Sequence, residues 1–254
     1  MKKLFVLVIL LTGCGANKTV RAPIQATAPA AQTSAMIPSI AIDSGDLTAL
    51  GTWKYEHDEA TPGSAIPSQQ YPVSTPSLDG ASRQFVVPFS GGGGARASVV
   101  FAQDSAATHF VYDIWVLLAN PNKVMNIEMD MNQVVGRYTY IFGTQCAHGS
   151  KSFEITYVTD QSHWRTTNIP CDPQAFRANT WHHFQIATHR DNAHHITYDY
   201  VVVDDKKTEW KDETVVAAEK LGWTPGDLVP NFQLDGAGSG IMTAYYDKMH
   251  VWRW

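Results

Sequence analysis

Acidic and amide side chains occupy every second position of one short stretch, NIEMDMNQ at residues 126–133. Glu128, Asp130 and Asn132 form this row, and apolar residues separate them. Alternate side chains of a β-strand point to opposite faces of its sheet. A strand at this place would therefore have one apolar face and one face that carries two carboxylates and an amide. Paired carboxyl groups are what general acid–base chemistry on a glycosidic bond requires.

Three interpretations of this row are open. In a hydrolase, two carboxyl groups about 5–5.5 Å apart would cleave a glycosidic bond, and Glu128 and Asp130 lie about 7 Å apart along a strand, on one face. In a binding site, the same groups would hold sugar hydroxyls while aromatic rings cover the apolar face of the sugar. In a structural surface, the row would be hydrogen-bonded internally, because an unpaired buried charge is costly. The candidate partners for its charges are Arg83, Arg137, Gln145, His163 and His183.

Strands rather than helices must position the row, because β-forming residues dominate the chain and turn residues interrupt them. The expected strands are Arg83–Phe89, Ala95–Phe101, His109–Leu118, Val124–Val134, Tyr138–Gly143, Phe153–Val158, Trp181–Thr188, His195–Val203, Val229–Leu234 and Ala244–Trp252. The glycine run at Ser90–Gly94 lacks the Lys-Ser/Thr pair of a phosphate loop and predicts a hairpin. The best helix candidate is the short segment Glu213–Leu221. This spacing predicts an all-β fold, a two-sheet antiparallel β-sandwich.

The first residues predict export. Two lysines precede an apolar run, Leu4–Leu11, that is too short to span a bilayer as a helix, and small residues follow it. This pattern is typical of a bacterial signal peptide, here residues 1–13. Because a cysteine follows directly, the segment resembles a lipoprotein signal, which implies a lipid on Cys14; an ordinary signal peptide is the alternative. Gly15 rather than Asp comes next, so the outer membrane of the cell envelope is the expected location.

The rest of the chain divides into a tether and one domain. Residues 14–44 are rich in Ala, Thr, Pro, Ser and Gln and predict a tether to the membrane. Residues 45–254 predict a single domain. Without the two signal-peptide lysines the formal net charge moves from −5 to −7. No basic run is left, which argues against nucleic acid as a partner.

The cysteines that remain beside Cys14 are Cys146 and Cys171. An exported chain meets an oxidising compartment, so we expect a disulfide between them; two free thiols or a half-built metal site are the alternatives. The adjacent histidine pairs at 182–183 and 194–195 point to opposite strand faces and do not favour a transition-metal site. A structural calcium would need oxygen ligands, to which Asp247 would contribute, and no other cofactor is expected.

Three segments, in order, resemble the concanavalin A-like lectin/glucanase superfamily. They are FVYDIWVLLANPNKVMNIEMDMNQ, TWHHFQIATHRDNAHHITYDYVVVDD and AYYDKMHVWRW. They are similar to the aromatic strand and Glu-x-Asp-x-Glu strand of laminarinases and related β-glucanases, to the Trp/Phe-His-x-aromatic strand, and to the closing strand with its buried Asp. The resemblance implies a concanavalin A-like jelly roll, a fold that hosts hydrolases, lyases, lectins and inert modules. The chain also resembles a group of exported bacterial lipoproteins that share its Trp-His-His and Asn-Phe-Gln-Leu-Asp-Gly stretches.

The resemblance assigns catalytic roles that this chain fills only in part. In the β-glucanase pattern the first Glu is the nucleophile, the Asp assists, and the last Glu is the acid/base. Glu128 and Asp130 match the first two positions, but the third is Asn132, or Gln133 in the variant with one more residue. Neither amide donates a proton to a leaving oxygen, and losing a general acid typically costs about 10²–10⁴-fold. Ordinary hydrolysis is therefore disfavoured unless another strand supplies the acid, for which Glu154 and Asp113 are the candidates.

Further ligand-binding candidates come from the neighbouring expected strands and from the loop that the disulfide would close. They are Trp115, Asp113, His183, Gln185, Trp164, Asn231 and Gln233, with Asp235 on the same face as the last two. Trp164 is a sugar-stacking candidate or a loop anchor. The predicted function is binding of an oligosaccharide or polysaccharide on the concave face of a lipid-anchored envelope protein. A glycoside hydrolase or polysaccharide lyase with a rearranged acid, and a structural protein with a vestigial groove, are the alternatives.

Overall fold

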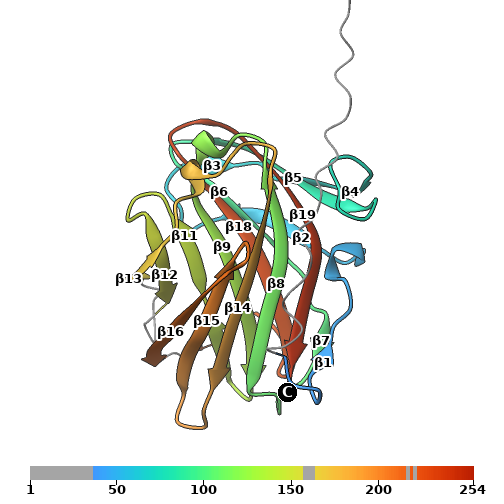
Figure 1. Ribbon diagram of the computed structural model, residues 1–254, viewed down its shortest axis with the longest axis vertical. Helices are drawn as coiled ribbons and strands as arrows, with labels where there is room; N and C mark the ends of the chain where they lie inside the picture. Colours follow the sequence, from blue (N-terminus) through green and yellow to red (C-terminus); the bar gives the residue numbers. More distant parts are fainter. Residues whose placement is uncertain (1–36, 157–163, 216–217, 220–221) are drawn as a thin grey trace, which may run out of the picture.

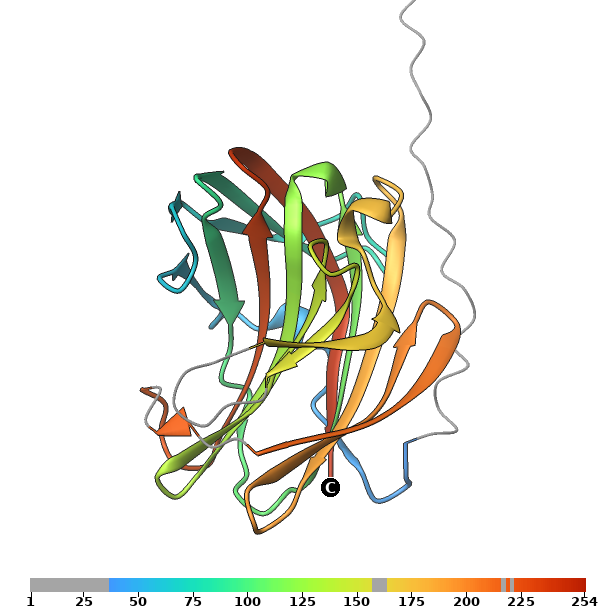
Figure 2. The ribbon, with the colours of Figure 1, turned by 90° about the vertical axis from the view of Figure 1, so that its left-hand side faces the viewer.

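The computed structural model describes residues 37–156, 164–215, 218–219 and 222–254. These residues form two antiparallel sheets packed face to face (Figure 1 and Figure 2). The predicted all-β fold, a two-sheet antiparallel β-sandwich, is confirmed. We call one of them the front sheet, because it faces the viewer in Figure 1, and the other one the back sheet. The front sheet holds β8 (His109–Leu118), β14 (Trp181–Arg190) and β15 (His195–Val203).

The front sheet contains nine strands within the described residues. Their order is β16 (Lys206–Val215), β15 (His195–Val203), β14 (Trp181–Arg190), β8 (His109–Leu118), β19 (Gly240–Arg253), β5 (Ser82–Ser90) and β3 (Ser64–Ala65), with β1 (Ile42–Asp43) beside β19 and β4 (Ser68–Val73) beside β5. The helix candidate Glu213–Leu221 is wrong where it is described, because its first residues end β16 and Ala218–Glu219 forms β17. The pairing of β16 with β15, which extends to Val215, overrides the local helix preference of Glu213.

The back sheet contains ten strands within the same part of the chain. Their order is β13 (Trp164–Pro170), β12 (Ser152–Thr156), β11 (Thr144–Ala147), β9 (Val124–Val135), β18 (Asp227–Gly236), β6 (Gly94–Ser98) and β2 (Lys54–Asp58), with β10 (Tyr138–Phe142) beside β9 and β17 (Ala218–Glu219), and β7 (Ala102–Gln103) beside β18. The part of the chain that the structure describes also contains three 3₁₀ turns between strands: η2 (Leu47–Ala49), η3 (Pro121–Lys123) and η4 (Pro173–Ala175). The described residues include no helix long and apolar enough to cross a membrane.

Aromatic side chains join the two sheets into one core. The ring of Phe232 in β18 lies 6.3 Å from that of Phe85 in β5 and 5.2 Å from that of Tyr246 in β19, centroid to centroid. Such pairs add to the large apolar area that each ring buries. The alternating residues Ile127, Met129 and Met131 of β9 belong to this core, as does Val124 at its start. The face opposite them therefore points away from the front sheet.

The domain begins earlier than the expected boundary at residue 45. Ile42 and Asp43 pair with Arg253 and Trp252 of β19, and Asp43 also binds His250. Ile37 packs on a small apolar cluster of the front sheet. Residues 37–44 thus belong to the folded domain, because β19 offers an unpaired edge there. The signal peptide, Cys14 and the tether up to residue 36 lie outside the described residues.

Candidate functional site

The acidic row lies on the outer face of the back sheet, as the alternation in β9 predicts. Glu128, Asp130 and Asn132 share this face, and their residues are 8%, 8% and 3% exposed. Two carboxylates that are this deeply buried need hydrogen-bond donors. The row therefore depends on the strands that flank β9.

Strand β18 supplies the first donors, because Asn231 pairs with Asp130 and Gln233 pairs with Glu128 in the antiparallel register. The Asn231 amide donates to Asp130 Oδ2 at 2.8 Å, and the Asn132 amide donates to Asn231 Oδ1 at 2.7 Å. The backbone N–H of Thr144 donates to Asp130 Oδ1 at 3.0 Å. The structure thus brings together five predicted site residues: Glu128, Asp130, Asn132, Asn231 and Gln233.

Gln233 is the centre of a cluster of three carboxyl groups. Its Nε2 lies 2.8 Å from Glu128 Oε1, 3.0 Å from Asp58 Oδ2 and 3.0 Å from Asp235 Oδ1. An amide nitrogen carries two hydrogens, so it cannot donate a full hydrogen bond to all three oxygens. Asp235 has room here because its partner in the ladder is Gly94, where an added Cβ would lie 2.1 Å from Asp235 Oδ1.

Burial raises the pKa values of Glu128, Asp130 and Asp235. Burial, followed by the charges of Asp235, Asp130 and Asp58, raises the pKa of Glu128 well above its usual range. Burial raises the pKa of Asp130 to about 7, although Asn231 and Thr144 oppose it as donors. Burial also raises the pKa of Asp235, whose carboxyl group hydrogen-bonds to that of Glu128. Two carboxyl groups in contact share a proton, because both cannot ionise at low cost.

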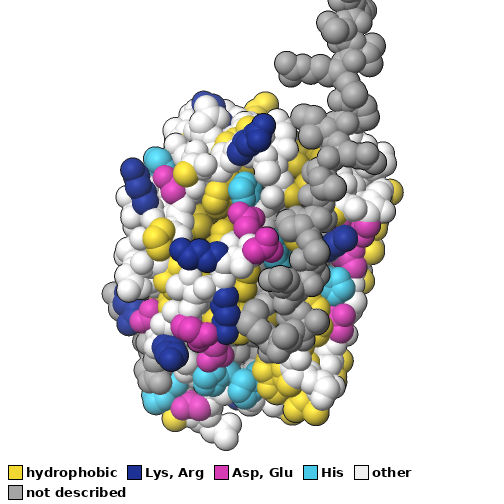
Figure 3. Space-filling view, in the orientation of Figure 1, with side chains coloured by type: hydrophobic (Ala, Val, Ile, Leu, Met, Phe, Trp, Pro, Cys, Tyr) yellow, Lys and Arg dark blue, Asp and Glu magenta, His cyan; other side chains and the backbone are white. Residues whose placement is uncertain are grey.

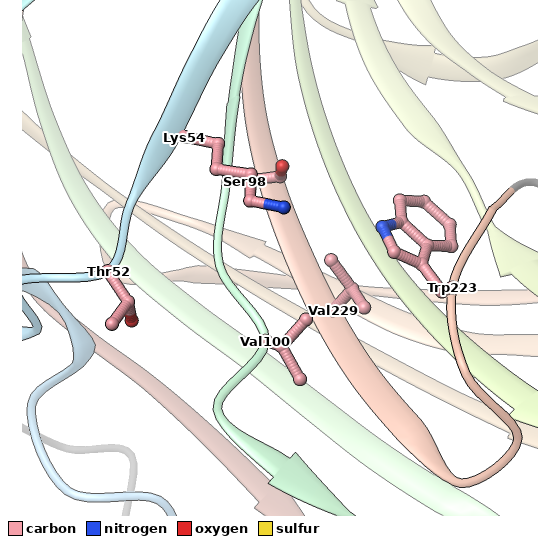
Figure 4. Close-up of a pocket in the computed structure, with 6 residues that line it drawn as sticks. All are labelled: Thr52, Lys54, Ser98, Val100, Trp223 and Val229. Atoms are coloured by element: carbon pink, nitrogen blue, oxygen red, sulfur yellow. The ribbon is translucent and has the colours of Figure 1, made fainter.

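A pocket of about 240 Å³ adjoins the Asn132 end of the row. Its lining residues are Thr52, Lys54, Ser98, Val100, Trp223 and Val229. Val229 pairs with Asn132 and Ser98 pairs with Asn231, so pocket and row form one continuous surface. In Figure 4 Trp223 extends from the segment before β18, and Val229 lies between it and Val100. The pocket thus sets an aromatic ring beside a row of hydrogen-bonding groups.

Four predicted ligand-binding residues lie elsewhere, on the outer face of the front sheet: Asp113, Trp115, His183 and Gln185. The expectation that they extend the groove of Glu128 is wrong, because β8 and β14 belong to the other sheet. This face, shown in Figure 3, mixes basic, acidic and histidine side chains.

Those four residues form a cluster of their own. His183 Nε2 lies 3.0 Å from both carboxylate oxygens of Asp113, Trp115 stacks on His183, and Gln185 donates to Asp113. Asp113 is therefore unavailable as a replacement acid for the row.

Other candidate partners of the row divide between near and far positions. Gln145 pairs with Glu128, and Glu154 pairs with Gln145 and accepts a hydrogen bond from it. Arg83 is wrong as a partner, because it donates to the carbonyls of Thr48 and Leu50. Arg137 contacts Tyr138 in the β9–β10 turn, and His163 lies outside the described residues.

The disulfide prediction is confirmed, and Trp164 lies at the start of β13. Cys146 and Cys171 are bonded, with 5.2 Å between their Cα atoms. Trp164 pairs with Thr156 at the far edge of the back sheet, several strands from the pocket. It does not line the pocket, so its role as a stacking residue stays a prediction.

Asp247, the calcium candidate, lies beside two further carboxylates. One oxygen each of Asp46, Asp79 and Asp247 lies within 4.8 Å of the others. Burial raises the pKa of Asp247, and the charge of Asp79 adds to this effect. Three carboxylate oxygens at this spacing suit a hard cation. A structural calcium stays a prediction at this site.

Sequence reasoning did not find Trp223, Lys54 or Asp58 as site residues. Trp223 lies in the turn before β18, and the other two lie on the edge strand β2. A turn has no periodic pattern, and the apolar alternation of β2 is weak. A tryptophan in a polar turn could have marked Trp223 as a site residue, since large aromatic residues in exposed turns are often functional.

We expect Glu128→Gln to stabilise the protein at alkaline pH. The folded-state pKa of Glu128 is raised, so the unfolded chain loses its proton first and wild-type stability falls as pH rises between the two pKa values. A glutamine keeps the bond from Gln233 and donates to Asp235 without titrating. The free energy of unfolding should match the wild type at pH 4 and exceed it at pH 9 by about 1 kcal/mol or more.

Urea unfolding at the two pH values measures this difference. Glu209→Gln is the matched control, because Glu209 is exposed and only pairs with Lys207. A Glu128→Gln variant that is no more stable than the wild type at pH 9 would contradict the buried-proton account.

No protein-family model and no curated protein matches the chain. Solved structures resemble it at low identity. One, reported for carbohydrate-binding modules of the β-sandwich superfamily, is 11% identical with a TM-score of 0.39, and the match covers 81% of this chain and 61% of that one. A carbohydrate esterase of the Shiga toxin-encoding bacteriophage phi24B is 10% identical with a TM-score of 0.44, over 80% and 90% of the two chains. The carbohydrate recognition domain of Emp47p is 9% identical with a TM-score of 0.41, over 88% and 99%. Likenesses this distant assign neither ligand nor activity.

Proposed function

We propose that the chain binds carbohydrate on the outer face of the back sheet, in the pocket and along the row that adjoins it. The supporting observation is the combination of a tryptophan ring with fixed hydrogen-bonding groups. Trp223 offers a flat apolar surface, and Asn132, Asn231, Asp130 and Gln233 offer oriented amides and carboxyls. Sugars require both kinds of contact, since a pyranose ring has apolar faces and a rim of hydroxyl groups.

A glycan array tests the proposal, with the Trp223→Ala variant beside the wild type. We expect the wild type to bind at least one glycan and the variant to lose about tenfold or more in affinity for it. Trp115→Ala is the matched control, because Trp115 stacks on His183 on the opposite sheet. Equal binding by the wild type and Trp223→Ala would remove the pocket from the proposal, and loss in Trp115→Ala would move the site to the front sheet.

A second candidate is a glycoside hydrolase or polysaccharide lyase. The observation that favours it is Asp130, whose pKa of about 7 suits proton transfer near neutrality. A reducing-sugar assay, and an absorbance assay for unsaturated products, on the same glycans distinguish the two candidates. Binding without product supports a binding protein, and product that disappears in Glu128→Gln supports the enzyme. A protein silent in every assay would support a structural surface.

The same proposal places the protein in the cell envelope, exported and anchored by a lipid on Cys14, with the outer membrane as its location. The arrangement of the basic start, the apolar run and the cysteine supports it. The proposal also includes membership of the concanavalin A-like superfamily, and the two-sheet architecture supports it.

A further inference from the structure

The site on the back sheet has more hydrogen-bond acceptors than donors. Asp58, Glu128 and Asp235 all point an oxygen at the single amide nitrogen of Gln233. Asp130 adds a fourth carboxyl group two residues along β9. A ligand that donates several hydrogen bonds would satisfy this cluster, whereas a ligand rich in acceptors would compete with it.

Positive charge is scarce around these acids. Arg96 on β6 contributes some, but its guanidinium is bound to Glu56 at 2.7 Å. Lys54 lines the pocket and lies four residues from Asp58 on β2, which is about 13 Å along a strand. Within the described residues, none of the four carboxyl groups forms an ion pair with Lys, Arg or His. A cationic ligand group would supply the missing charge.

A separate observation also indicates a donor ligand. Gln145 Oε1 is buried and has no hydrogen-bond partner, and the residue is only 3% exposed. Gln145 pairs directly with Glu128, so the two side chains share the outer face. Its Nε2 donates to Glu154, which settles which end of the amide is the free acceptor. A buried acceptor without a donor destabilises the free protein, and a ligand that donates a hydrogen bond to it removes this cost.

We propose that the ligand of this site is a glycan with free amino groups, a glucosamine-type oligosaccharide, and this inference rests on the carbohydrate-binding function proposed above. A sugar ammonium group carries three donors and a positive charge. It would bind between Gln145 Oε1 and the carboxyl groups of Glu128 and Asp235, while the sugar ring extends toward Trp223. Uronic-acid glycans would meet like charges and are excluded.

Calorimetric titration with matched hexasaccharides at pH 6 tests the preference. The panel contains a glucosamine oligomer, its fully N-acetylated counterpart, a neutral β-glucan oligomer and an oligogalacturonate. We expect the glucosamine oligomer to bind about tenfold or more tightly than the N-acetylated one. Glu128→Gln and Asp235→Asn should shrink this ratio. Asp199→Asn, which removes a carboxylate paired with His189 on the front sheet, should leave the ratio unchanged.

The outcomes separate this inference from the function on which it rests. If a neutral or N-acetylated oligomer binds as tightly as the glucosamine oligomer, the amino-sugar inference fails and carbohydrate binding stands. If a hexalysine peptide binds as tightly, the preference is one for charge alone and the inference also fails. If no glycan of the panel or of the array binds, the proposed function itself fails.

Discussion

Replacing Gln233 with methionine should destabilise the protein far more at pH 8 than at pH 4. Methionine has a similar shape but donates no hydrogen bond, so Asp58, Glu128 and Asp235 lose the amide that all three contact. Hydrogen bonds to charged groups contribute more than neutral ones, and we expect a loss of about 3 kcal/mol at pH 8. At pH 4 protonated carboxyl groups donate to one another, and the expected loss is about 1 kcal/mol.

The sign of this difference follows from linkage. Without the amide, the charged forms of the buried acids are less stable in the folded state, so the folded-state pKa values of Glu128 and Asp235 rise further above the unfolded ones. Stability then falls more steeply as pH rises through that interval. Urea unfolding of both proteins at the two pH values gives the measurement.

Gln84→Met is the matched control, since the Gln84 amide donates to the neutral Tyr245 hydroxyl at 2.7 Å. Its effect should be small and independent of pH between 4 and 8. A Gln233→Met loss that is the same at both pH values would show that the cluster carries no charge in the folded protein.

Removing the disulfide with Cys146→Ala and Cys171→Ala together should lower the free energy of unfolding by about 3 kcal/mol. The bond closes a loop with a sequence separation of 25 residues, and the chain-entropy model gives this magnitude for a loop of that length. Thermal unfolding with and without reductant checks it. Reductant should lower the midpoint of the wild type toward that of the double variant and leave the variant unchanged.

The same variant reports on the site. Cys146 belongs to β11 and directly follows Gln145 in that strand. The side chain of Gln145 lies beside Glu128. If the disulfide only restricts the unfolded chain, glycan affinity measured well below the melting temperature should stay within a factor of about two. A larger loss of affinity would mean that the bond also holds β11 in place.

The sequence predicts the immediate surroundings of the row well because alternation is a local property. The apolar residues of 126–133 indicate which side chains enter the core, and the pattern in 229–234 does the same for Asn231 and Gln233. Strand pairing then places the two polar faces together. Alternation does not indicate which sheet a strand joins, since a strand of either sheet has one core face and one outer face. For that reason Asp113 and His183 carried the expected pattern but lie on the opposite side of the molecule.

Residues outside regular patterns were harder to predict. Asp58 lies on an edge strand whose side chains are mostly exposed, and Trp223 lies in a turn. Their positions depend on long-range packing of β2 and of the approach to β18. The apparent helix at Glu213–Leu221 failed for a related reason, because pairing with β15 decided its first residues.

Folding of this domain is coupled to proton uptake from the solution, because Glu128 and Asp235 share a proton in the folded state. In the unfolded chain both carboxyl groups are ionised at neutral pH, whereas burial raises both pKa values in the folded domain. The chain therefore takes up hydrogen ions as its back sheet assembles and returns them when it unfolds. The heat of unfolding near pH 7 then includes the heat of ionisation of the buffer, and it differs between phosphate and Tris at equal pH.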